Sequence, residues 1–172
     1  ERSRGLGDVY KRQPGMHASG LSLFGIDWSV SLNTVARVGA GDTICVLPTS
    51  LDVFIGFREP TIYIDNGLKK DGCRYNLVLR HEHQHQQVSI AALEYFMPRI
   101  RAEIQKALPV VRPRAVASLS ATDAATEEMN GEYIRLIRPL VNDFKATLLY
   151  EQKKLDNREN YRFESGICKG RP

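Results

Sequence analysis

The stretch that decides the fold is residues 77–104, LVLRHEHQHQQVSIAALEYFMPRIRAEI. Its apolar residues and two of its histidines recur at intervals of three and four, as residues do along one face of an α-helix. The positions on this face are Leu77, Val78, His81, His85, Val88, Ala92, Phe96, Ile100 and Ile104. We therefore expect a long amphipathic helix, which Pro98 either kinks or divides into two segments.

A second helical pattern follows a proline-containing connection at residues 108–118. Ser120 or Thr122 is a suitable N-cap, and acidic residues occupy the first turns after it. The apolar stripe of this pattern consists of Met129, Tyr133, Ile137, Leu140, Phe144, Leu148 and Leu155. We expect a second long helix with an interior proline, Pro139, whereas the residues beyond Asn157 show no clear period.

Extended segments precede the helices. Apolar and polar residues alternate from Phe24 to Asn33, which is typical of a strand with one buried face. A second extended stretch runs from Thr43 to Phe57, and a third strand, Thr61–Ile64, comes just before the turn residues 65–67. Strands and helices in separate blocks indicate an α+β domain, with a small antiparallel or mixed sheet followed by two long packed helices.

The composition fits an ordinary globular chain. Its 172 residues suffice for one compact domain, and 42% of them are hydrophobic and 26% charged. No apolar run approaches the roughly 20 residues that a membrane helix requires, so we expect no membrane span. The sequence does not indicate an oligomeric state.

The first thirteen residues differ from the rest. Asp8-Val9-Tyr10-Lys11-Arg12-Gln13 is encoded by GAT GTG TAT AAG AGA CAG, which resembles the end sequence of a transposon used to prepare sequencing libraries. We therefore expect residues 1–13 to be an adaptor scar rather than native protein, and residues 14–172 to be a single domain. Leaving out four basic and two acidic side chains lowers the net charge from +4 to +2. The remaining basic residues are scattered, so we expect no nucleic-acid partner, and a cationic surface-binding module is a further alternative that depends mainly on the charge of residues 1–13.

Three of the four histidines lie within five positions, His81-Glu82-His83-Gln84-His85, which has the form H-E-x-x-H. Residues four apart share a helix face, so the imidazoles of His81 and His85 can converge on one metal ion. Glu82 is close enough to act as general base on a water that zinc acidifies from a pKa of about 15.7 to about 7. His83 points elsewhere on the helix, and we expect it to be exposed or to support the site indirectly.

The motif and its setting resemble the zincin metallopeptidases. The chain is most similar to an uncharacterised family of secreted bacterial proteins that are regarded as zinc-dependent proteases. The likeness covers roughly Leu21 to Cys168, with weaker echoes in residues 71–75 and 155–161. The extended form H-E-x-x-H-x-x-G-x-x-H is excluded, because Val88 and Ala91 stand where it requires Gly and His. The resemblance implies a zincin-like fold, a Zn²⁺ cofactor, a peptide or protein substrate, and a secreted or periplasmic location.

The third metal ligand should be a carboxylate, because no histidine follows His85. If the two long helices pack antiparallel, the end of the second returns toward the start of the first. Three carboxylates lie in that region: Glu151 extends the apolar stripe, while Asp156 and Glu159 belong to the segment that echoes the protease family. We favour Glu159, with Asp156 and Glu151 as alternatives.

The cysteines bear on the compartment. Cys45, Cys73 and Cys168 lack the C-x-x-C spacing of a separate zinc site. The same return of the second helix brings Cys73 near Cys168, so a disulfide between them is one expectation, and it would imply an oxidising compartment. Three buried free thiols in a cytosolic protein are the alternative.

The sequence therefore predicts a zinc metallopeptidase that binds one Zn²⁺ through His81, His85 and Glu159, with Glu82 as general base. The alternative is a non-catalytic metal-binding interaction domain of the same fold. A further hypothesis is that Thr61–Ile64 is an edge strand that aligns an extended peptide by strand addition. For Tyr161 we favour aromatic packing over donation of its hydroxyl to the developing oxyanion.

Overall fold

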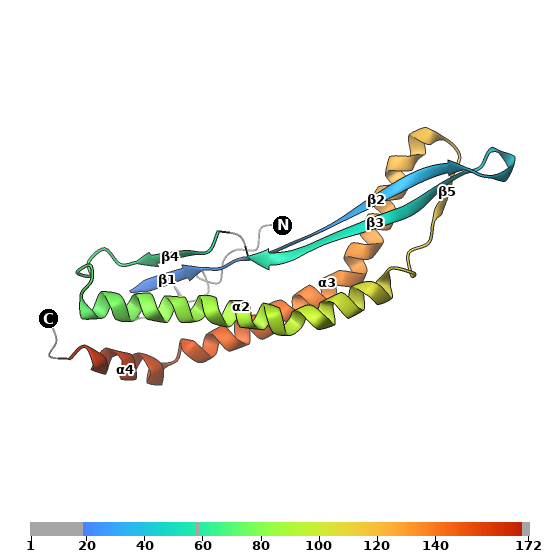
Figure 1. Cartoon of the computed structure of the whole chain (residues 1–172). Coiled ribbons are helices and arrows are strands. Elements are labelled where there is room, and N and C mark those ends of the chain that lie inside the picture. The colour runs from blue at the N-terminus through green and yellow to red at the C-terminus, as the bar shows by residue number, and fades with distance from the viewer. Residues whose placement is uncertain (1–18, 58, 170–172) are drawn as a thin grey trace. The chain divides into compact units, whose positions relative to one another are not determined.

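A computed structural model describes residues 19–57 and 59–169 (Figure 1). The expectation for residues 1–13 lies outside the described residues and stays a prediction. Strands come first and long helices follow, so the α+β class is confirmed. The elements are β1 (Gly20–Leu23), β2 (Ile26–Val38), a 3₁₀ turn (Ala40–Asp42), β3 (Ile44–Phe57), β4 (Thr61–Ile64), α2 (Cys73–Ala107), β5 (Arg114–Val116), a second 3₁₀ turn (Leu119–Ala121), α3 (Thr122–Leu155) and α4 (Arg158–Ile167).

The described residues divide into two compact units. Unit 1 contains the described residues up to Asp27, those within Gly56–Tyr95, and those from Phe144 onward. Unit 2 contains Trp28–Ile55 and Phe96–Asp143. Each long helix contributes residues to both units, and the H-E-x-x-H segment belongs to unit 1. The expectation of a single domain over residues 14–172 stays a prediction.

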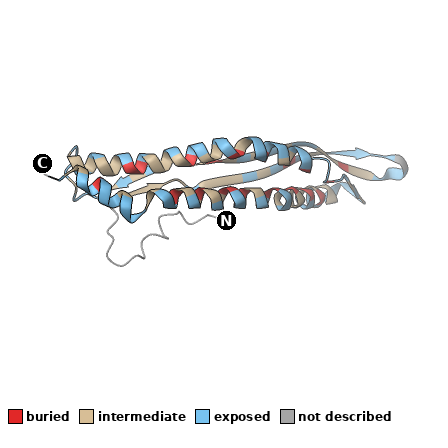
Figure 2. Cartoon of the chain, turned by 90° about the horizontal axis from the view of Figure 1, so that it is seen from below, coloured by how far each residue is buried: buried red, intermediate tan, exposed pale blue. Residues whose placement is uncertain are grey.

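Unit 2 is built on the three-stranded sheet β2-β3-β5. The arrows of β2 and β3 point in opposite directions (Figure 1), and β5 pairs antiparallel with β3, Ile44 opposite Val116. Residues 108–118 were expected to be a plain connection, and β5 forms there because it completes the hydrogen bonds of the β3 edge. The buried residues of unit 2, red in Figure 2, include the core cluster Leu32, Val46, Ala107, Val111, Ala125, Met129 and Tyr133.

The interior prolines do not end the helices. Helix α2 is continuous over 35 residues with Pro98 inside, and α3 over 34 residues with Pro139 inside. The expectation that Pro98 divides its helix is therefore wrong. A proline costs a helix about 3 kcal/mol, but burial of a large apolar side chain gains about 1.5–3 kcal/mol. Phe96 and Ile100 are both buried on either side of Pro98, and their packing offsets the cost.

Unit 1 contains the two-stranded antiparallel sheet β1-β4. Gly20 lies opposite Ile64 and Leu23 opposite Thr61, so the strand expected at Thr61–Ile64 is confirmed. The strand expected from Phe24 begins later, at Ile26, where β2 starts. Phe24 instead packs its ring against that of Phe57, with the ring centroids 4.1 Å apart.

Helix α4 was not expected from the sequence. It begins after Asn157, whose side chain accepts a hydrogen bond of 2.8 Å from the backbone N–H of Asn160. The only buried residue that α4 contributes is Glu164. Its buried position is a carboxylate, whereas its large apolar residue Phe163 is exposed, so apolar character and burial do not coincide along this helix.

The disulfide between Cys73 and Cys168 is present, with an S–S distance of 2.06 Å. It joins the first residue of α2 to the residue that ends α4, and both cysteines belong to unit 1 together with the H-E-x-x-H segment. Cys45 belongs to unit 2 and forms no disulfide within the described residues. Neither α2 nor α3, nor any other described helix, combines the length and apolar character needed to cross a bilayer.

We expect the disulfide to contribute substantially to stability, because its two cysteines are 95 residues apart and a long loop restricts the unfolded chain strongly. Replacing Cys73 and Cys168 together by Ser should lower the free energy of unfolding by about 2–4 kcal/mol in urea denaturation. Cys45→Ser, at the free cysteine, is the matched control and should cost less than about 1 kcal/mol. Equal losses in the two proteins would contradict this prediction.

Candidate metal centre

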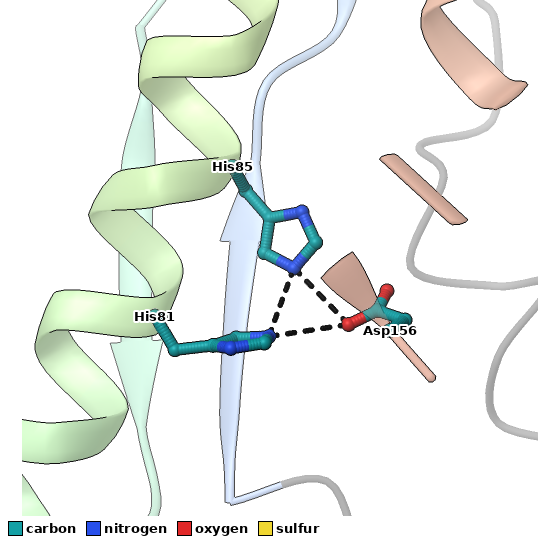
Figure 3. A group of neighbouring side chains, drawn as sticks. All are labelled: His81, His85 and Asp156. Carbon is teal, nitrogen blue, oxygen red and sulfur yellow. Dashed lines mark hydrogen bonds and ion pairs between the residues drawn. The ribbon is translucent and has the colours of Figure 1, made fainter. Parts of the chain in front are cut away.

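Three side chains of unit 1 place one ligand atom each at the corners of a small triangle (Figure 3). His81 and His85 lie one turn apart on α2, and Asp156 immediately follows α3. The Nε2 atoms of the two imidazoles are 3.1 Å apart. Asp156 Oδ1 lies 3.2 Å from His81 Nε2 and 3.1 Å from His85 Nε2. The spacing of the two histidines predicted that their imidazoles converge, and this is confirmed.

The size of this triangle suits a tetrahedral metal ion. Zinc binds imidazole nitrogen and carboxylate oxygen at about 2.0–2.2 Å, so two ligands of a tetrahedral site lie about 3.3–3.5 Å apart. The three separations of 3.1–3.2 Å are already close to that value, so a metal ion could bind with little movement of the side chains. Three protein ligands is also the number found in catalytic zinc sites.

Hydrogen bonds fix the tautomer of His85. The side-chain amide nitrogen of Gln152 donates to the backbone carbonyl of His85 at 2.9 Å and to Ser89 Oγ at 2.8 Å. With its nitrogen committed, Gln152 presents its carbonyl oxygen to His85 Nδ1, which must carry the proton and donate. The Nε2 atom of His85 therefore turns a lone pair toward the triangle.

The same holds for His81. Its Nδ1 lies 3.2 Å from the carboxylate of Glu164, which is buried and can only accept. In the neutral imidazole of His81, Nε2 then also carries a lone pair, and Asp156 Oδ1 is the third electron-rich atom. Such atoms repel one another at 3.1–3.2 Å unless a proton or a metal ion lies between them. Imidazole and carboxylate ligands together suit several divalent transition metals, and zinc is the one that the H-E-x-x-H pattern favours.

The structure places Asp156, rather than Glu159, beside the two histidines. Glu159 is exposed in the first turn of α4. Glu151, the other alternative, forms an exposed ion pair with Lys154 at 2.7 Å. The preference for Glu159 is thus replaced by Asp156, because the chain turns at residues 156–157 and the new helix carries Glu159 away from the imidazoles.

Two residues of the site were missed by the sequence reasoning. Gln152 lies four positions after Leu148 and continues the buried stripe of α3. From the sequence we expected this role for Glu151, which lies three positions after Leu148. A polar residue on an apolar stripe was the available signal for Gln152. No signal pointed to Glu164, because its helix was not recognised. His83 is exposed on α2, on the side where the helical period put it.

Glu82 is buried under strand β1, with 6% of its surface exposed. Asp65 N–H donates to Ser19 carbonyl at 2.9 Å, so Ser19 and Asp65 form a hydrogen-bonded pair of the β1-β4 ladder. Pairs alternate along an antiparallel ladder, so Ser22 turns its N–H away from β4. That N–H donates to the Glu82 carboxylate. Gly20 permits the close approach, since a Cβ there would lie 2.5 Å from Glu82 Oε1.

The electrostatics of the site follow from burial and from the partners of each group. Burial raises the pKa of Glu82, and the charges of His85 and His81 only partly offset this. For both histidines burial is the largest effect and opposes protonation, but the hydrogen bond to Asp156 together with Glu164 at His81 and Gln152 at His85 outweighs it and raises the pKa. For Asp156 burial alone would raise the pKa, but the hydrogen bonds from His81, His85 and Tyr161 hold it far below its ordinary value.

Tyr161 connects the site to the surface of α4. Its hydroxyl donates to Asp156 Oδ1 at 2.6 Å, and its ring lies against that of His81, with the centroids 5.3 Å apart. Burial of the hydroxyl and the neighbouring Asp156 charge raise the pKa of Tyr161, so the phenol stays protonated and acts as a donor.

Comparison with known proteins adds no relative, since no protein-family model, curated protein or solved structure matched this chain. The resemblance to zincin metallopeptidases therefore stays an expectation that depends on the H-E-x-x-H segment and its surroundings.

We expect Asp156→Asn to weaken zinc binding by at least tenfold, because a neutral amide replaces the anionic ligand. Glu159→Gln removes one negative charge three residues away and should leave the affinity unchanged. Competition titration with a chromogenic chelator measures both. The opposite order, with Glu159→Gln the weaker binder, would restore Glu159 as the third ligand.

The raised histidine pKa values predict how the metal-free protein responds to pH. A histidine pKa above its unfolded value of 6.5 contributes stability that is present below pH 6.5 and is lost as the pH rises through the folded-state pKa. Zinc should do the opposite, because protons compete with it for the imidazoles. From pH 6 to pH 9, thermal denaturation should show the metal-free protein losing stability and zinc stabilising it more. Without zinc, stability that rises over this range would contradict the prediction.

Proposed function

We propose that this protein is a zinc-dependent peptidase in which His81, His85 and Asp156 hold the metal and Glu82 is the general base. The observation that carries the proposal is the triangle of three lone-pair atoms with a buried carboxylate beside it. A zinc ion bound there would supply a Lewis acid for a peptide carbonyl and would acidify a water molecule.

Glu82 has the properties of a general base. Its raised pKa brings it nearer to neutrality, where proton acceptance and donation are both efficient. The Ser22 N–H orients its carboxylate. In the proposed reaction Glu82 takes a proton from the attacking water and gives it to the nitrogen of the departing amine as the peptide C–N bond breaks.

The neighbours of the ligands hold them in place. Glu164 and Gln152 accept the Nδ1 protons of His81 and His85, which keeps the Nε2 lone pairs directed at the metal position. Tyr161 fixes Asp156 through its hydroxyl. Because this hydroxyl stays protonated and Tyr161 is 38% exposed, it could donate its single proton to the oxygen of a bound substrate in place of Asp156.

The alternative is a metal-binding interaction domain without turnover. The burial of Glu82 favours the enzyme, because a carboxylate that is not itself in the triangle is costly to bury and gains no metal bond in return. The zincin-like fold and the peptide substrate belong to this proposal through the resemblance. A secreted or periplasmic location belongs to it too, and the Cys73–Cys168 disulfide supports an oxidising compartment.

We expect Glu82→Gln to lower the hydrolysis of a denatured protein or peptide mixture by about 10²–10⁴-fold, because the proton acceptor is lost. Zinc content, measured by mass spectrometry, should stay at the wild-type value. Glu94→Gln is the matched control, an exposed carboxylate on the same helix, and should leave activity unchanged.

Either of two results would contradict the peptidase proposal. Zinc-loaded wild type that cleaves no substrate would favour the interaction domain. Full activity in Glu82→Gln would remove Glu82 from the mechanism.

A further inference from the structure

A surface depression of about 370 Å³ opens on α4 within unit 1. Its lining residues are Arg158, Tyr161, Arg162 and Ser165. These positions are spaced by three and four residues and so form one face of the helix. We call this set the arginine cleft.

Tyr161 is shared between the arginine cleft and the metal centre. Its hydroxyl contacts Asp156, and its ring packs on His81 while also lining the cleft. At 100° per residue, Tyr161 lies on α4 between Glu164, which faces His81, and the two arginines. A molecule bound in the cleft would therefore be next to the ligands of the metal.

The two guanidinium groups of the cleft are available to a ligand. Arg158 and Arg162 are both exposed, and within residues 19–57 and 59–169 neither forms an ion pair. Two other described arginines form ion pairs: Arg99 with Asp143 at 2.8 Å, and Arg114 with Glu132.

The placement of these arginines does not favour the helix itself. Like charges four residues apart on a helix repel each other. Arg158 is moreover the first residue of α4, where the positive end of the helix dipole disfavours a cation. Residues that lower the stability of their own helix are expected where they serve binding. Here the neighbouring positive charges and the helix dipole both increase the attraction for an anion.

We propose that the arginine cleft binds a carboxylate of the peptide being cleaved, and so selects acidic substrates. Guanidinium groups bind carboxylates through paired, charge-assisted hydrogen bonds. The carboxylate is either the C-terminus of the peptide or an Asp or Glu side chain near the scissile bond. This inference rests on the proposed peptidase function.

The test uses the zinc-loaded protein and a peptide that wild type cleaves, made in three forms. One form has a free C-terminus, one is amidated, and one is amidated with Glu in place of Gln next to the cleaved bond. The first readout is kcat/KM for each form. The second readout is the affinity of the zinc-loaded Glu82→Gln variant for the same three peptides, which it does not cleave. If wild type cleaves no peptide, the affinity is measured for N-acetylated tetra-alanine, for its amide, and for an amidated form that contains Glu.

Carboxylate-bearing forms should be preferred about tenfold, which corresponds to about 1.4 kcal/mol. A preference for the free C-terminus alone identifies the terminal carboxylate, and a preference for the Glu form identifies the side chain. Replacing Arg158 and Arg162 by Gln should remove the preference without changing the zinc content. The control variant carries Arg101→Gln and Arg138→Gln, at two exposed arginines of unit 2. It loses the same amount of charge and should keep the preference for carboxylate-bearing peptides.

The inference is overturned if wild type shows no preference for carboxylate-bearing peptides. It is also overturned if the preference survives the replacement of Arg158 and Arg162, because the metal would then be the group that attracts the carboxylate. It is also overturned if the control variant loses the preference, since a general charge effect would then explain it. Failure of zinc-loaded wild type to cleave any peptide counts against the proposed function instead. In that case the binding comparison still decides whether the cleft selects carboxylates.

Discussion

The mutual approach of three electron-rich atoms is the constraint on which the site depends. Two imidazole lone pairs and a carboxylate oxygen lie 3.1–3.2 Å from one another in a largely buried position. Their repulsion is relieved by a proton on an imidazole or by a metal ion, and the separations suit a tetrahedral divalent ion. Protons therefore stabilise the metal-free site at low pH, and a metal ion can replace them as the pH rises.

The rest of unit 1 keeps those atoms together. Glu164 and Gln152 hold the outer nitrogens of the two imidazoles, and the disulfide ties the ends of α2 and α4 that frame them. Strand β1 covers Glu82 so closely that a Cβ at position 20 would lie 2.5 Å from Glu82 Oε1 and from Val78 Cγ1. Each contact acts on a ligand or on Glu82 from a different element, so the geometry of the site is determined by tertiary packing around a short helical motif.

The sequence was informative where a regular period coincided with burial. Alternation and helical spacing predicted the α+β class, both long helices and the convergence of His81 and His85, because these depend on local backbone geometry. The third ligand did not follow from spacing: Asp156 sits at a turn between helices, whose direction is set by a cap at Asn157 rather than by an apolar pattern. Pro98 was expected to kink or divide its helix, and the division did not occur because its buried neighbours outweigh the local preference of proline.

The most direct test is X-ray absorption at the zinc edge on protein loaded with one equivalent of zinc. The account predicts two imidazole nitrogens and oxygen ligands at about 2.0–2.2 Å, with no sulfur at about 2.3 Å, and loss of one imidazole in His85→Ala. Failure to bind zinc stoichiometrically, or a spectrum in His85→Ala identical to that of wild type, would contradict the account.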